Sequence, residues 1–391
     1  MHFQLSTAVN SDNQVRVVHI TSAHAPLDVR IFRKECKSLA RAGYQVTLIA
    51  PSNQNFVSDG VRIRALPVPT GRTRRFTVTV WKAFREALRE PADIFHLHDP
   101  ELLPAGLLLA LCGKKVIYDC HENVADDFLN RKWIPRGLRS TCSKLADLGE
   151  KLATRGFSGI VVADEQLCMR FRNVSVPTAK VQNYPILEEF PANLAADSSR
   201  YSSRLGVSFG GVSTWRAIEP SIHAIGMLPE ELQFKLILGG GCDSELLLQR
   251  VSQLPGWKRV DYRGQVLRKD MIESLTRAGL ALVLYKYKDH GDDLDIRSNR
   301  LFEALAAGLP VITSNFSRWR DFVEGTGCGM TVDPDEPAQI ARALLYLIEH
   351  PHEAGEMGRR GADAIRGKYN WHSEEERLLA LYARLTNGKD S

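Results

Sequence analysis

The chain has 391 residues, of which 44% are hydrophobic and 25% are charged. This length is too great for one ordinary core and the composition is that of a globular protein, so we expect two domains. The net charge of +5 argues against a dedicated nucleic-acid-binding protein, although it allows a local basic patch.

Cysteine usage and the ends of the chain bear on the cellular compartment. Seven cysteines, spread from Cys36 to Cys328 without a close pair, predict neither a disulfide framework nor a zinc site, which is typical of a reducing cytoplasm. The N-terminus lacks the apolar core and cleavage site of a signal peptide, and the longest apolar run, 102–112, is too short to span a bilayer. We therefore expect a cytoplasmic protein.

Apolar strand-like segments alternate with helix-like segments in the first half of the chain, which is typical of βαβ units. We expect a flexible tail over 1–14 and a helix over 30–42 that ends at Gly43. The expected strands are residues 14–21, 45–50, 61–66, 93–98, 115–119 and 159–163. Together these elements predict a doubly wound domain over residues 15–188.

The second half repeats this alternation after a polar segment without periodicity, which predicts an interdomain linker over 189–206. Its expected strands are residues 207–211, 234–238, 260–264, 280–284, 311–313 and 329–332. They predict a second doubly wound domain over 207–370 with a parallel sheet, so the fold class is α/β with two Rossmann-like domains. In the remaining segment, 371–391, apolar residues recur at helical spacing, so we expect a helix that docks its apolar face.

A strand, loop and helix junction near the start of the last third carries the most informative chemistry. The predicted helix 299–307 is capped at Ser298, and Asn299, Arg300 and Glu303 lie on a different face from its apolar stripe. The free amides at the helix start, together with Arg300, suit a diphosphate, while Glu303 could accept hydrogen bonds from sugar or ribose hydroxyls. A solvated helix face is the alternative interpretation.

Histidines gather at the predicted strand ends of the first domain. His121 follows the strand 115–119, and His24 and the pair His96 and His98 occupy comparable positions. A lone histidine is usually structural, but this concentration indicates a site. The nearby Asp28 could instead cap the helix that begins after it, which is the structural alternative.

The order and spacing of several motifs resemble the GT-B glycosyltransferases of the large retaining family four, over almost the whole chain. The motifs are residues 24–32, 43–46, 96–100, 118–122, 236–241, the helix of Glu303, and 369–371. The resemblance implies two Rossmann-like domains that face each other across a cleft. It also implies that the C-terminal domain holds a nucleotide sugar, with UDP- or GDP-sugar expected, and that the N-terminal domain presents the acceptor.

The resemblance also implies roles for donor-side residues. Glu303 would hold the nucleotide ribose, and Asp295, where the family usually has Glu, would touch the transferred sugar unless it is ordinary loop polarity. Arg300 and Arg216 would neutralise the leaving diphosphate, although Arg216 could be a surface cation because Ala217 stands where a glycine usually follows. The remaining donor-binding candidates are Gly239, Gly240, Gly241, Ser298 and Asn299, the glycines permitting a close backbone approach.

On the acceptor side, the resemblance implies that His121 contacts the donor sugar or positions the acceptor. The other acceptor-side candidates are His24, Asp28, Arg30, His98, Asp99 and Glu122. The implied mechanism is same-face substitution with retention. A metal is not required because Arg300 and the helix start supply the positive charge; the alternative is a metal-binding pair formed by Asp293 and Asp295.

Two basic stretches that contain Trp or Phe, 72–88 and 131–139, favour a peripheral contact with anionic membrane, although a solvated helix face and an ordinary loop are equally compatible with them. The expected function is transfer of a sugar from a nucleotide sugar to a glycan or lipid-linked saccharide, in exopolysaccharide, capsule or lipopolysaccharide assembly. The alternatives are a GT-B sugar-nucleotide epimerase and a non-catalytic sugar-nucleotide-binding subunit. No nucleic-acid partner is expected.

Overall fold

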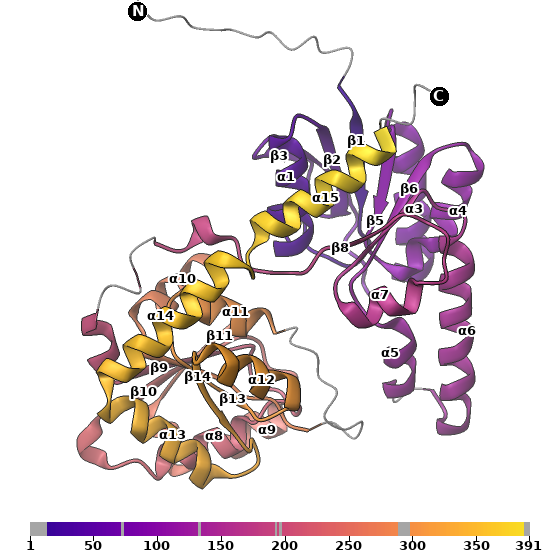
Figure 1. The fold of residues 1–391 in the computed structure, drawn as a ribbon. Helices are drawn as coiled ribbons and strands as arrows, with labels where there is room; N and C mark the ends of the chain where they lie inside the picture. Colours follow the sequence, from indigo (N-terminus) through magenta and orange to yellow (C-terminus); the bar gives the residue numbers. More distant parts are fainter. Residues whose placement is uncertain are drawn as a thin grey trace, which may run out of the picture. The chain divides into compact units, whose positions relative to one another are not determined.

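The computed structural model describes residues 14–71, 74–131, 134–191, 194, 198–287 and 298–386. The chain divides into two compact units, seen in Figure 1. Unit 1 comprises Met1–Asn183 and His372–Ser391, and unit 2 comprises Tyr184–Trp371. Within the described ranges, no helix combines the length and the apolar character needed to cross a membrane.

In the described part of unit 1, one sheet has the strand order β3-β4-β2-β1-β5-β6-β7-β8. Its strands are β1 (Arg16–Ile20), β2 (Gln45–Pro51), β3 (Phe56–Ser58), β4 (Val61–Leu66), β5 (Ile94–Leu97), β6 (Lys115–Cys120), β7 (Gly159–Val162) and β8 (Thr178–Lys180). Neighbouring strands from β4 to β8 pair in parallel. β1 pairs with β2 on one side and with β5 on the other, so the order of the strands reverses between β1 and β5. Parallel sheets bind ligands at the carboxyl ends of the two strands at such a switch point.

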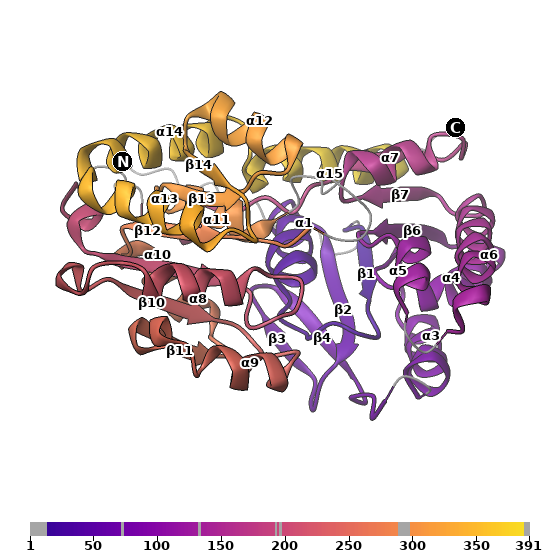
Figure 2. The same cartoon turned by 90° about the horizontal axis from the view of Figure 1, so that it is seen from below.

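Helices cover this sheet, and α4, α5 and α6 lie together beside it (Figure 2). The helical elements are the segment Val29–Cys36 with α1 (Lys37–Arg41), the segment Arg75–Thr79 with α3 (Val80–Arg89), the short turn Pro100–Leu102 with α4 (Leu103–Leu111), α5 (Val124–Asn130), α6 (Arg136–Thr154), α7 (Glu165–Phe171) and α15 (Trp371–Thr386). The central strands β1, β2, β5, β6 and β7 are almost wholly buried, because helices pack on both faces of a parallel sheet.

The edge strand β3 was not predicted, and it runs antiparallel to β4. The two strands are joined by Asp59 and Gly60, whose φ angles are 48° and 78°. Positive φ at both central residues is what a two-residue hairpin turn requires, and Asp-Gly is a favoured pair for it. The first sheet is therefore mixed at this edge.

The predicted docking of the C-terminal helix is confirmed within unit 1. Leu378, Leu381 and Tyr382 of α15 are buried. The Tyr382 hydroxyl lies 2.8 Å from Nδ1 of His96 in β5, and its ring meets that of Tyr44 edge-on at 5.7 Å. The last helix of the chain thus completes the core of the first unit.

The described part of unit 2 contains a sheet that is parallel, as predicted, and its strand order is β11-β10-β9-β12-β13-β14. Its strands are β9 (Leu205–Phe209), β10 (Lys235–Gly239), β11 (Val260–Gly264), β12 (Leu280–Val283), β13 (Val311–Ser314) and β14 (Gly329–Val332). Its helices are α8 (Ile218–Gly226), α9 (Glu245–Val251), α10 (Arg268–Arg277), α11 (Asn299–Ala306), α12 (Ser317–Thr326), α13 (Pro337–Glu349) and α14 (Pro351–Gly367), with short helical turns at Leu187–Glu189, Ser198–Ser202, Glu230–Leu232 and Pro255–Arg259. Here the switch point lies between β9 and β12.

The segment predicted as a linker, 189–206, is anchored in unit 2 where the structure describes it. The buried guanidinium of Arg200 donates hydrogen bonds to the backbone oxygens of Leu275, Ala278 and Ala307, at 2.8, 3.0 and 2.8 Å. The Tyr201 hydroxyl donates to the oxygen of Gly308 at 2.9 Å. The polar composition of the segment gave no sign of this anchoring, which depends on one arginine that hydrogen-bonds to three backbone carbonyl groups of the core.

Candidate functional site

The site of unit 1 is built at the carboxyl ends of β1 and β5. Oδ2 of Asp99, after β5, accepts hydrogen bonds from the Thr21 hydroxyl at 2.8 Å and the Ser22 amide at 2.6 Å. Oδ1 of the same carboxylate lies 3.4 Å from Nε2 of His24. The predicted residues His24 and Asp99 are therefore in contact, and Asp99 is fixed by the backbone after β1.

His121 is held by an acidic residue that sequence reasoning did not single out. Its Nδ1 lies 3.2 Å from Oδ2 of Asp119, a buried residue of β6. Arg30 grips both oxygens of Asp119, from Nε at 2.8 Å and Nη2 at 2.7 Å, and Nδ1 of His98 lies 3.1 Å from Oδ2. Asp119 is thus the centre of a buried network that orients the imidazole of His121.

This network shifts the pKa values of its members. Burial alone would lower the pKa of His121, but the Asp119 carboxylate outweighs burial and raises it above the ordinary 6.5. Burial would raise the pKa of Asp119, yet the charges of Arg30 and His121 hold it well below the usual 3.8. Burial lowers the pKa of His98 despite its contact with Asp119. The network therefore favours the protonated form of His121 and the neutral form of His98.

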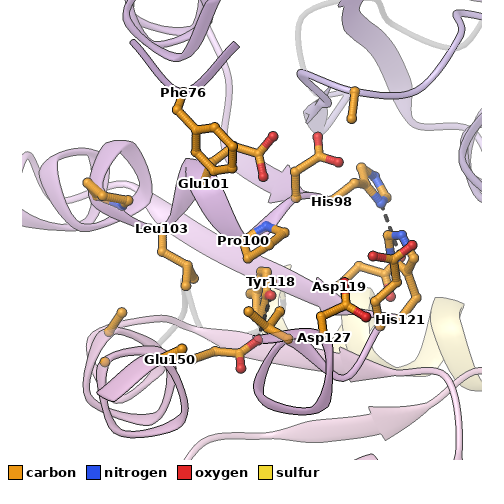
Figure 3. Close-up of a pocket in the computed structure, with 18 of the residues that line it drawn as sticks. Phe76, His98, Pro100, Glu101, Leu103, Tyr118, Asp119, His121, Asp127 and Glu150 are labelled. Carbon is orange, nitrogen blue, oxygen red and sulfur yellow. Dashed lines mark hydrogen bonds and ion pairs between the residues drawn. The ribbon is translucent and has the colours of Figure 1, made fainter. Parts of the chain in front are cut away.

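A cavity of about 1000 Å³ opens at this network and lies within unit 1. Figure 3 shows Asp119 and His121 on one side of it and Leu103 on the opposite side. The apolar part of the lining comes mainly from α4, α5 and α6 and includes Leu103, Leu107, Val124, Phe128, Ala146 and Ala153. The cavity therefore joins a polar end, suited to hydroxyl groups, to an apolar end.

Tyr118 and Glu150 form a second polar contact in the cavity wall, joined by the dashed line in Figure 3. The hydroxyl of Tyr118, in β6, donates to Oε1 of Glu150, in α6, at 2.7 Å. Arg170 forms an ion pair with Glu150 and lies 2.6 Å from Asp147. The buried carboxylate of Glu150 is therefore neutralised from outside the cavity, which leaves this wall without net charge.

Behind His98, two further histidines and Glu35 are fully buried. Nδ1 of His19 lies 2.8 Å from Nε2 of His98, and Oε2 of Glu35 lies 3.8 Å from Nδ1 of His96. Two groups of described residues could hold a metal ion by the closeness of their ligand atoms. They are His19, Glu35, His96 and His98, and His98, Asp119 and His121.

Arg30 is the cation that the two acidic residues of this cluster share. Arg30 lies 3.2 Å from Glu35 and 2.7 Å from Asp119, so one guanidinium faces both carboxylates. Asp119 raises the pKa of His121, whereas burial holds the pKa values of His19 and His96 well below 6.5. The expectation that no metal is required stays a prediction.

In unit 2, Tyr285 joins two of the predicted donor-side residues. The guanidinium of Arg216 stacks on its ring, 4.6 Å from the centroid, and on Trp215 at the same distance. The Tyr285 hydroxyl lies 3.0 Å from Oγ of Ser298, which caps α11 by accepting from the Leu301 amide. Among the described residues, Nε of Arg216 has no hydrogen-bond partner. The arrangement brings an arginine to the region of a helix start, a combination that suits a diphosphate.

Glu303 lies on α11 between two arginines. Nη1 of Arg300 donates to its Oε2 at 2.7 Å, and Nη1 of Arg268 contacts its Oε1. The Glu303 side chain is only 7% exposed, whereas that of Arg300 is 37% exposed. The predicted pair Arg300 and Glu303 is therefore in contact, and Arg268 is a third member that sequence reasoning missed.

The predicted glycines pack against a second strand-end loop. A Cβ on Gly240, at φ +127°, would lie 2.3 Å from the amide nitrogen of Gly211, and a Cβ on Gly211 would lie 1.9 Å from the oxygen of Gly241. These glycines are therefore needed for the close approach of the ends of β9 and β10. Their contact with a nucleotide stays a prediction.

Other predicted residues have structural partners or lie outside the description. Asp28 caps the segment Val29–Cys36 by accepting from the amides of Arg30 and Ile31, which was the structural alternative. Arg30 is buried against Asp119 and does not line the cavity, whereas Glu122 does. Asp295 and Asp293 lie outside the described residues, and so do Lys132 and Trp133 of the basic stretch.

Sequence reasoning missed several residues of these sites. Asp119 stands in a mostly apolar strand two residues before His121, and that position was the available signal. Glu101 carries no comparable signal, because its partners Arg75, at 2.8 Å, and the Ser22 hydroxyl, also at 2.8 Å, are distant in sequence. Arg268 opens α10 and looks like an ordinary surface cation in the sequence.

Comparisons with known proteins agree on the class. Residues 27–185 match the model of a glycosyl transferase 4-like domain, and residues 223–380 match that of a glycosyl transferase-like domain. D-rhamnosyltransferase WbpZ of Pseudomonas aeruginosa is 28% identical over 302 residues, which cover 74% of this chain and 73% of that protein.

Two further proteins are similar to this chain, one over about half of its length and the other over almost all of it. The uncharacterized glycosyltransferase MJ1069 of Methanocaldococcus jannaschii is 24% identical over 195 residues, so the match spans 48% of this chain and 47% of that protein. The structure of Alr3699/HepE from Anabaena in complex with UDP and glucose has a TM-score of 0.69 at 12% identity, covering 95% of this chain and 100% of the other.

Proposed function

We propose that this chain, which belongs to the GT-B glycosyltransferases of the group 1 type, transfers a sugar with retention from a UDP- or GDP-sugar to a glycan or lipid-linked saccharide. In this proposal unit 2 holds the nucleotide, and unit 1 supplies the groups that act on the sugar and the acceptor. The process served in this proposal is assembly of an exported or surface polysaccharide. The similarity to a D-rhamnosyltransferase supports the transfer of a sugar.

The observation that carries the proposal is the cavity of unit 1, with His121 held at its polar end by Asp119 at 3.2 Å. The Asp119 carboxylate raises the pKa of His121 and so favours the protonated imidazole, which in this proposal donates a hydrogen bond to a sugar hydroxyl. Asp119 stays ionised and fixes which ring nitrogen faces it. His24 and Asp99 contribute further polar groups at the same end.

Donor binding rests on the charges around α11. A departing nucleoside diphosphate gains negative charge, and we assign its neutralisation to Arg216 and Arg300 with the amides at the start of α11. Glu303 keeps acceptor capacity for ribose hydroxyls, because each carboxylate oxygen has two lone pairs. The complex of Alr3699/HepE with UDP and glucose, a protein of the same fold, supports this type of donor.

The acceptor is proposed to carry an apolar portion, since the cavity runs from the histidines to the apolar side chains of α4 and α6. A nearby surface supports delivery from an anionic membrane. On α3 and the segment before it, Phe76, Val78 and Trp81 are exposed beside the cations Arg74, Lys82 and Arg85. Such a face lies on lipid through its apolar side chains, and its cations attract anionic headgroups.

The test is a turnover assay with UDP-, GDP- and ADP-sugars, each with lipid-linked and free saccharide acceptors, in which released nucleotide and the product's anomeric configuration are measured. The proposal expects nucleotide release that depends on the acceptor, and a product with the donor's configuration. Conversion of the sugar without nucleotide release would instead indicate an epimerase. Donor binding without turnover on any acceptor would indicate a binding subunit.

A further inference from the structure

Arg268, the first residue of α10, occupies a position between two carboxylates of unit 2. Its Nε donates to Oε2 of Glu189 at 3.0 Å, its Nη2 contacts the same oxygen, and its Nη1 contacts Oε1 of Glu303. Its side chain is 13% exposed. We propose that Arg268 is a positioning residue that fixes the Glu303 carboxylate for the ribose hydroxyls of the donor, an inference that rests on the proposed function.

The two arginines beside Glu303 differ in how firmly they are held. Arg300 reaches Oε2 of Glu303 from one helical turn away and is 37% exposed. Arg268 reaches Oε1 and is tied at its other edge to Glu189 by two contacts. The exposed arginine can therefore turn towards a diphosphate, whereas the buried one stays with the carboxylate.

Charge balance gives Arg268 a role that Arg300 cannot fill alone. Glu189, Arg268, Glu303 and Arg300 alternate in sign, so the row is neutral as it stands. When a diphosphate recruits Arg300, Glu303 would lose one neutralising partner while it is nearly buried. Arg268 keeps that carboxylate paired, because an uncompensated buried charge is strongly unfavourable.

The contact with Arg268 also determines the direction in which the Glu303 carboxylate points. A carboxylate on a helix can rotate about its terminal bond, which is soft and broad. With Oε1 fixed by Arg268, the lone pairs left on Oε2 point in a set direction once Arg300 leaves. Ribose presents two adjacent hydroxyl groups, so a carboxylate of fixed orientation can accept from both at once.

The test compares the affinity of the full chain for ribose and deoxyribose ligands. Titrations use UDP and GDP and their 2′,3′-dideoxy forms, against the wild type, Arg268→Ala, Arg268→Lys and Glu189→Gln. The wild type is expected to prefer the ribose form of its nucleotide by roughly 10-fold or more, the effect of hydrogen bonds to a charged group. Arg268→Ala is expected to reduce that preference to below about 3-fold.

The matched control is Arg250→Ala, which removes an exposed arginine paired with Glu219 at 2.7 Å in the same unit. It should keep the wild-type preference. If Arg268→Ala does not fold, Arg268→Lys and Glu189→Gln test the proposal instead. Arg268→Lys keeps the positive charge but weakens the contact with Glu303, and Glu189→Gln removes the negative charge that holds Arg268 in place. Both should lower the ribose preference.

A purely structural role gives a different result. In that case Arg268→Ala and Arg268→Lys would lower the melting temperature while the ratio of ribose to dideoxy affinity stayed at its wild-type value, which would overturn the proposal. Failure of the proposed function is distinguishable, because the wild type itself would then bind neither UDP nor GDP. The double variant Arg268→Ala with Glu303→Ala should show no loss of ribose preference beyond that of Glu303→Ala alone.

Discussion

Nδ1 of His121 and Oδ2 of Asp119 lie 3.2 Å apart at the end of β6, and this contact sets the charge of the polar end of the cavity. The carboxylate is also gripped by Arg30, so its own position is fixed from behind. The first prediction follows from the raised pKa of His121.

The contact between His121 and Asp119 should add to the free energy of unfolding at low pH and add less as the pH rises. Because the pKa of His121 is raised above 6.5 in the folded protein, its stabilisation is fully present below that value and is lost as pH rises through the raised pKa. We expect the free energy of unfolding of the wild type to exceed that of His121→Gln most at pH below 6.5. Urea denaturation at a series of pH values measures the difference; a difference that grows with rising pH would contradict the contact.

Asp119→Ala should be strongly destabilising, because it leaves the buried Arg30 guanidinium without its main partner. Removing one member of a buried ion pair costs about 3–5 kcal/mol, which chemical denaturation can measure. Asp261→Ala is the matched control, since its partner Arg263 is on the surface and such pairs are worth about 0–1 kcal/mol. Equal losses in the two variants would show that Asp119 does not organise the network.

Arg216→Ala and Arg300→Ala should weaken the binding of UDP or GDP more than the binding of the corresponding nucleoside. Both are assigned to the diphosphate, which the nucleoside lacks. Calorimetric titration of each ligand gives the two affinities. Glu303→Ala is the contrast, because it should weaken nucleoside and diphosphate alike through the ribose. Equal losses of both ligands in the arginine variants would remove those residues from the phosphate site.

Reversing the charge of Arg74, Lys82 and Arg85 should reduce binding to anionic vesicles, because each cation near the surface contributes about 1 kcal/mol. Sedimentation with vesicles that contain phosphatidylserine measures the effect, and donor hydrolysis in solution should be unchanged. Reversal of Arg359 and Arg366, exposed cations of α14, is the control. Unchanged sedimentation of the α3 variant would refute the membrane face.

Chelation should leave sugar transfer unchanged, since arginines and a helix start are proposed to supply the positive charge at the diphosphate. Turnover measured after dialysis against EDTA, with and without added Mg²⁺ or Mn²⁺, is the test. Loss of activity that an added metal restores would point to the histidine clusters or to Asp293 and Asp295 instead.

Much of the fold could be predicted from apolar periodicity. Strands such as β2 and β12 match their predicted ranges to within one residue, because a buried parallel strand is a short apolar run between turn residues. The edge strand β3 could not be predicted, because three residues are too few to show an alternation of apolar and polar side chains. The anchoring of Arg200 escaped because its acceptors, among them Ala278 and Ala307, are about 80 to 100 residues away in sequence.

The candidate sites divide in the same way. Residues at strand ends and at the start of α11 could be named from position alone, and His24, Asp99 and His121 do meet at one cavity. Contacts between residues that are distant in sequence could not be predicted in this way. These contacts determine which side chain orients another, as Asp119 orients His121. Asp28 shows the converse, since its local pattern fitted a helix cap and a site equally. In the structure it caps the segment Val29–Cys36 and also lies 3.8 Å from Nδ1 of His24.

The central claim, that His121 acts in the chemistry while unit 2 holds the nucleotide, is tested most directly by measuring the turnover of His121→Ala together with its affinity for UDP or GDP. We expect kcat to fall by roughly 100-fold or more, as when a positioned hydrogen-bond donor in an active site is lost, while the dissociation constant stays within about 2-fold of the wild type. A loss of nucleotide affinity as large as that of Glu303→Ala, or an unchanged kcat, would contradict it.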